Sequence, residues 1–194
     1  MRAPALSPRV RKLTLALHLG CSVGWLGAAM SYLVLGVVTG RSSNGETIRA
    51  GWIAMELTGW YVIVPLAVGS LVTGCVMGLG TRWGLFRHYW VAISLALTLL
   101  ATIVLVLHMP TVSAQADRAR QATAAELGEL GGDALHPAVG LGVLAFILVV
   151  NVFKPRGMTR YGQRKHYEER MRSADGWAAD QRAQVAQAPI TRSS

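Results

Sequence analysis

Residues 89–109 read YWVAISLALTLLATIVLVLHM and contain no Asp, Glu, Lys or Arg. At about 1.5 Å of rise per residue, a helix of this length crosses the roughly 30 Å hydrocarbon core of a bilayer. Because a helix satisfies its own backbone hydrogen bonds inside hydrocarbon, the stretch predicts a transmembrane helix. His108, close to its end, is an ionisable exception in an otherwise apolar run.

Three other apolar stretches have comparable character: Leu13–Val38, Trp52–Leu79 and Pro137–Phe153. The last is the shortest and spans roughly 25 Å, which suffices if it stands upright. The chain is 52% hydrophobic and 15% charged, with a mean hydropathy of +0.37, whereas soluble domains carry about 25% charged residues. Four such stretches leave too little polar surface for a soluble protein. We therefore predict an all-α polytopic membrane protein, an antiparallel bundle of four transmembrane helices.

The distribution of positive charge predicts its orientation. Of the 19 Lys and Arg residues, all but Arg41, Arg49, Arg118 and Arg120 lie in segments on the side of the two termini. Cytoplasmic segments carry the excess of Lys and Arg, so both termini are predicted to be cytoplasmic. The net charge of +9 is then a topological signal, strengthened by attraction to anionic lipid headgroups, and calls for no nucleic-acid partner.

The predicted domain plan has three parts. Residues 1–10 form a cytoplasmic N-terminal segment, and residues 11–155 form the transmembrane domain, with spans at about 13–38, 52–79, 89–109 and 137–153. Residues 156–194 form a basic cytoplasmic tail, disordered beyond Ser173 because that part is polar and rich in Ala and Gln. Pro65 is expected to kink the second span. A long outer loop is expected between the third and fourth spans, containing a short surface helix.

Three ionisable residues fall at the same predicted depth, near the outer ends of their spans: Glu56, His108 and His136. A carboxylate and two imidazoles suit zinc, copper or iron, and two histidines on neighbouring helices could also ligate a haem. They could equally form a proton relay or a quinone site. In the structural alternative, His136 caps its helix, His108 lies among headgroups, and Glu56 pairs with Arg49 or Trp52.

A second, weaker set lies toward the inner side. His18 and Cys21 share a helix face, and Cys75 has a comparable depth on the second span. One imidazole and two thiols would suit Cu(I), and His18 alone could ligate a haem or another cofactor. Otherwise the cysteines are small core residues, and His18 bonds to Asn151 or a carbonyl. His88 lies at the inner interface and, by helical phase, on a different face from His108.

Four segments carry a family resemblance: HLGCSVGWLG (18–27), PLAVGSLVTG (65–74), LGTRWGLFRHYW (79–90) and KPRGMTRYG (154–162). Over about residues 11–165 the chain resembles a family of small bacterial four-helix integral membrane proteins of unknown function. That family is distantly similar to the membrane domain of copper-resistance D-type proteins. The resemblance implies a four-helix bundle in the bacterial inner membrane and no activity, and its copper link favours metal binding.

Three functions remain open from the sequence. The first is an accessory or scaffold protein of the inner membrane, working with a membrane-protein partner or a second copy of itself. The second is a haem- or metal-binding protein, in copper handling or electron transfer, that uses the intramembrane histidines. The third is a transporter or channel, which with four helices per chain would require an oligomer.

Overall fold

The computed structural model describes residues 7–80, 88–155 and 157–187. Within this part of the chain, four helical rods are long and apolar enough to cross a membrane. They are α1 (Pro8–Arg41), the continuous rod of α2 (Gly45–Thr58), η1 (Gly59–Ile63) and α3 (Val64–Gly80), then α4 (Tyr89–Gln121) and α6 (Leu135–Phe153). The short helix α5 (Ala124–Leu127) precedes α6, and α7 (Arg160–Gln187) follows it. The chain is a multi-pass, all-α membrane protein.

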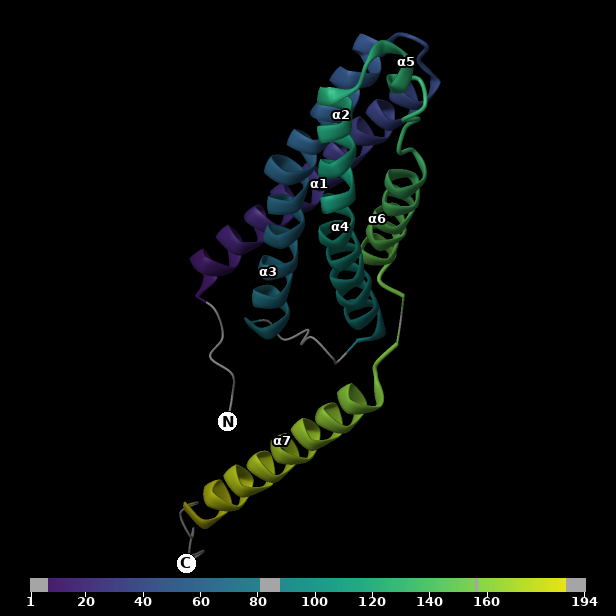
Figure 1. The fold of residues 1–194 in the computed structure, drawn as a ribbon. Coiled ribbons are helices and arrows are strands. Elements are labelled where there is room, and N and C mark those ends of the chain that lie inside the picture. The colour runs from purple at the N-terminus through teal and green to yellow at the C-terminus, as the bar shows by residue number, and fades with distance from the viewer. Residues whose placement is uncertain (1–6, 81–87, 156, 188–194) are drawn as a thin grey trace, which may run out of the picture.

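The four rods form a bundle in which successive rods run in opposite directions (Figure 1). Helix α1 packs against α2, α3 and α6, and α4 packs against the same three helices. The bent α2–α3 rod and α6 therefore each bridge α1 and α4. This arrangement brings the middle of α4 to the level of the start of α6, although the rest of α4 and a loop separate them in sequence.

Most side chains of the rods face outward. Only 11% of the most apolar window of α4, and 6% of that of α6, is buried. Large apolar residues such as Leu107, Val139 and Phe153 are exposed, as expected for helices whose solvent is lipid. Burial is strongest at the end of the bundle that contains α2. There Ile48 and Met55 of α2 belong to one buried cluster with residues of α4, namely Met109, Val112, Ala116 and Ala119.

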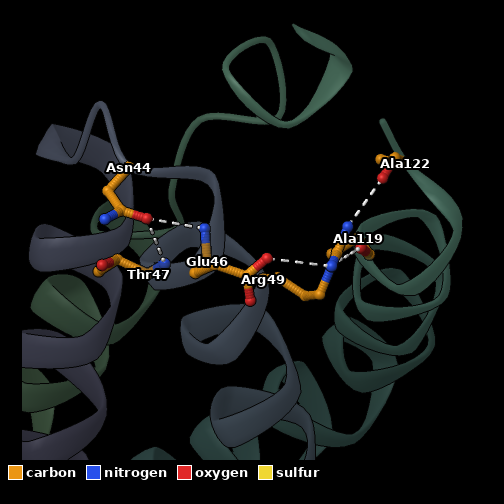
Figure 2. Close-up of polar contacts among 6 residues, drawn as sticks. All are labelled: Asn44, Glu46, Thr47, Arg49, Ala119 and Ala122. Carbon is orange, nitrogen blue, oxygen red and sulfur yellow. Dashed lines mark hydrogen bonds and ion pairs between the residues drawn. The ribbon is translucent and has the colours of Figure 1, made fainter. Parts of the chain in front are cut away.

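The rods are longer than their predicted spans, and this corrects the predicted loops. Helix α4 continues through Pro110 to Gln121, where a loop was expected. Proline removes one helical hydrogen bond, but Val112, Ala116 and Ala119 bury one face of the extension against α2. Helix α2 begins at Gly45, where the Asn44 side chain accepts hydrogen bonds from the Glu46 and Thr47 amides (Figure 2). We call residues 42–58 and 110–134 the cap.

The disturbance expected at Pro65 takes the form of a π turn, Gly59–Ile63, just before it. The Val64 amide bonds to the Gly59 carbonyl, five residues back. Pro65 has no amide proton, and its ring crowds the carbonyl four residues earlier, so a widened turn relieves the contact.

The tail differs from the prediction of disorder. Helix α7 runs unbroken from Arg160 through Ser173 to Gln187, because its Ala, Gln, Glu and Arg residues are good helix formers. Figure 1 shows α7 leading away from the bundle. The predicted tail residues 188–194, and residues 81–87 of the family-like segment 79–90, lie outside the described residues.

Candidate metal centre

Two histidines and one aspartate meet where the cap joins the bundle. His108 Nε2 lies 2.6 Å from Asp133 Oδ2, and His136 Nδ1 lies 3.0 Å from Asp133 Oδ1. The two imidazole rings stack, with centroids 3.8 Å apart and an interplanar angle of 19°. One carboxylate thus holds two imidazoles that come from α4 and from the first turn of α6.

Glycines fix the position of Asp133. Gly131 has a φ of 58°, a left-handed conformation that favours glycine. The backbone of Gly132 and Asp133 rests directly on α1, where a Cβ on Gly36 would collide with the Asp133 carbonyl and one on Gly40 would lie 3.2 Å from Gly132 Cα. Trp52 Nε1 donates a hydrogen bond to the Gly131 carbonyl at 3.2 Å. The loop of residues 131–133 is therefore held by contacts with both α1 and α2.

The centre is closed on one side and open on the other. The side chains of His108 and Asp133 are 18% and 10% exposed, whereas that of His136 is 55% exposed. An ion could enter past His136, while the carboxylate is shielded from water.

These three residues could hold a metal ion. Among the described residues they form a group whose candidate ligand atoms all lie within 4.8 Å of one another. Neutral imidazole nitrogen and carboxylate oxygen are ligands of zinc and of Cu(II). Three protein ligands leave a fourth position for water, as in zinc sites that keep an open position.

The structure brings together two of the three residues predicted for the outer set. Glu56 instead forms an ion pair with Arg120 of the extended α4, and Arg120 also contacts Asp117 at 2.7 Å. The expected alternative partners of Glu56 are engaged elsewhere: Arg49 bonds to α4 carbonyls, and Trp52 to Gly131. Asp133, which the sequence analysis missed, takes the place of Glu56. The signal available for it was an acid three residues before His136, after two glycines.

The inner set does not assemble into a metal-ligating group among the described residues. His18 Nδ1 lies 3.1 Å from both the Ser70 carbonyl and Thr73 Oγ1. Since a carbonyl only accepts, Nδ1 carries the proton in neutral His18. The Cys21 sulfur faces Gly69, and Cys75 is half-buried with a free thiol.

Two neighbours of the inner set are also placed. Asn151 donates to Ser94 Oγ at 3.0 Å. Of the two partners expected for His18, a carbonyl or Asn151, the structure therefore shows the carbonyl, that of Ser70. His88 precedes α4, where it pairs with Met158 in an isolated bridge, roughly 30 Å along that helix from His108.

Comparisons with known proteins yield no relative. No family model, no curated protein and no solved structure matches the chain. The family resemblance in the sequence therefore remains a prediction, and functional argument rests on the site itself.

Proposed function

We propose that this chain is an accessory protein of the bacterial inner membrane that binds one divalent transition-metal ion through His108, Asp133 and His136. The observation that carries the proposal is the shared carboxylate: Asp133 contacts both stacked imidazoles. Ionisable residues at membrane depth are costly and call for a functional explanation. Here three of them converge from separate segments.

The ligand chemistry selects the class of ion. Two imidazoles and one carboxylate suit borderline ions such as Zn²⁺ and Cu²⁺ rather than Cu(I), which prefers thiols. The cysteines, predicted as soft ligands, are not part of this group. The stacked rings are in contact at 3.8 Å and leave no space for a porphyrin between them, so a haem held by this histidine pair is not proposed.

The site's position supports a role at the membrane boundary. Trp60 and Tyr61 are exposed on η1, in the middle of the α2–α3 rod, and aromatic residues gather at bilayer interfaces. From Tyr61 to Gly80 the rod rises about 28 Å, close to the thickness of the hydrocarbon core. Met109 packs beside Gly59, just before these aromatics. With both termini cytoplasmic, His108 then lies at the outer boundary.

Zinc content of the purified protein tests the proposal. The full chain in detergent is stripped with a chelator, reloaded with Zn²⁺, dialysed and analysed for metal. We expect one zinc per chain in the wild type and a loss in His108→Ala and His136→Ala. His166→Ala, in the exposed part of α7, is the matched control and should keep its zinc. A wild type that binds no zinc, or histidine variants that bind as much zinc as the wild type, would overturn the proposal.

A further inference from the structure

A buried tyrosine lies beside the metal centre. Tyr32 is 6% exposed and sits one turn before Gly36 on the same face of α1. Gly36 is the residue on which the Asp133 backbone rests. On its other side, the Tyr32 ring approaches Gly59 together with Met109, which adjoins His108. Tyr32 therefore lies beside Met109 and one turn from the contact of Asp133 with α1.

Its hydroxyl has no hydrogen-bond partner among the residues that the structure describes. A buried polar group without a partner destabilises a fold, and such groups are rare enough to need an explanation, such as an ion or a bound water. Thr39 and Gln115 also carry a buried oxygen without a partner. Tyr32 differs from them because its ring lies against Gly59 beside Met109, the residue after His108, and one turn from the contact of Asp133 with Gly36.

The described residues give the hydroxyl no hydrogen bond, and none to Asp133 in particular. The hydrogen bonds of the Asp133 carboxylate go to His108 and His136. A buried phenol that packs beside the site and has no partner of its own can be satisfied by a group bound to the ion. Zinc with three protein ligands completes its tetrahedron with water.

We propose that the Tyr32 hydroxyl belongs to the metal centre and hydrogen-bonds to the water molecule that fills the fourth coordination position. The assignment rests on the proposed function. It makes Tyr32 a positioning residue: it holds the exchangeable ligand, while His108, Asp133 and His136 hold the ion. The buried hydroxyl then has a partner only when the ion is bound.

Tyr32→Phe tests the assignment, with Tyr61→Phe as the matched control because Tyr61 is 77% exposed. Zinc affinity is measured by competition with a chelator. Tyr32→Phe should still bind one zinc, but about three- to tenfold more weakly, as expected for loss of one hydrogen bond. Its metal-free form should be as thermally stable as the wild type or more so, because a buried group without a partner is gone. A merely structural tyrosine would lower stability instead.

A second measurement does not depend on the variant. Water enriched in oxygen-17 should broaden the electron paramagnetic resonance lines of Cu²⁺ bound to the wild-type protein. Equal zinc affinity in Tyr32→Phe and wild type, or no broadening, would overturn the role of Tyr32 while leaving the metal centre intact. A wild type that binds neither ion would instead overturn the metal centre, and this assignment with it.

Discussion

The imidazole of His108 stacks on that of His136 at a centroid distance of 3.8 Å, and a single carboxylate, Asp133, contacts both rings. The rings belong to helices that pack side by side, whereas the carboxylate lies on a loop. Formation of the site therefore depends on the loop being seated correctly between α1 and α2. The charge of the carboxylate and the position of the loop can be changed separately, by Asp133→Asn and by Gly36→Ala.

Replacement of Asp133 by Asn keeps the shape of the side chain and removes its charge. The amide nitrogen donates and cannot ligate a metal ion, so one ligand oxygen is lost. We expect zinc affinity to fall at least tenfold. Removing a residue that only hydrogen-bonds to a metal ligand already lowers affinity by about that factor. Asp117→Asn is the control, because Asp117 is exposed and pairs with Arg120 rather than with the metal centre. Unchanged zinc affinity in Asp133→Asn would exclude the carboxylate as a ligand.

Gly36→Ala tests the seat of the loop. The added methyl group would collide with the Asp133 carbonyl, which is backbone and cannot rotate away. We expect a loss of about 1–3 kcal/mol in stability, typical of overpacking, seen as a lower Tm in detergent, together with weaker zinc binding.

The control for this change is on the same helix. Gly27 has open space at its Cβ position, and alanine has the higher helix propensity. Gly27→Ala should therefore leave both Tm and zinc binding unchanged or slightly improved. If the two alanine variants behave alike, the close approach of Asp133 to α1 is not what holds the loop.

Depth along a helix could be read from the sequence, but rotation about its axis could not. Counting residues from the ends of apolar runs placed His108 and His136 at one level, because rise per residue is constant. The same count placed Glu56 with them. Its actual partner, Arg120, falls in the stretch expected to be the outer loop, because the apolar run ends at Met109. One misplaced helix end thus left Glu56 without its ion-pair partner and made it look like a metal ligand.

The role of Asp133 depends on a tertiary contact that has no local pattern. Gly20 and Gly24 have the four-residue spacing typical of close helix contacts, yet Gly20 has nothing near its Cβ position. The pair that matters, Gly36 and Gly40, receives a loop from a distant part of the chain rather than a helix. The four apolar rods, in contrast, follow from composition alone, because lipid-facing side chains must be apolar along the whole span.

Arg49 ties the cap together by capping the end of α4. Its Nε and Nη2 donate to the carbonyls of Ala119 and Ala122 at 3.0 and 2.9 Å (Figure 2). A cation at a helix C-terminus also meets the negative end of the helix dipole. Arg49→Gln should cost about 1–2 kcal/mol, measured as a lower Tm. Arg118→Gln, an exposed residue of the same helix end, should cost little; an equal loss would show that Arg49 acts only through its charge.

The capping box of α5 predicts a pH dependence. Hydrogen bonds from the Thr123 amide, and next from its hydroxyl, hold the pKa of Glu126 below its usual range. A depressed pKa in the folded state stabilises the protein above the unfolded value of about 4.3, and this contribution is lost as pH falls through the folded pKa. The wild type should thus have a higher Tm than Glu126→Gln at pH 7, and the difference should shrink below about pH 4. A difference that stays constant with pH would contradict this origin.

The predicted orientation can be tested with single cysteines. In a chain whose Cys21 and Cys75 are replaced by alanine, Ser43→Cys places a thiol in the short link between α1 and α2, and Ala174→Cys places one on α7; both positions are exposed. The excess of Lys and Arg on the side of the termini predicts that this side is cytoplasmic. A membrane-impermeant maleimide added to intact cells should therefore label position 43 and not position 174. After the cells are permeabilised, both should react. Labelling of position 174 alone in intact cells would invert the topology and place the cap, with His108, Asp133 and His136, on the cytoplasmic side.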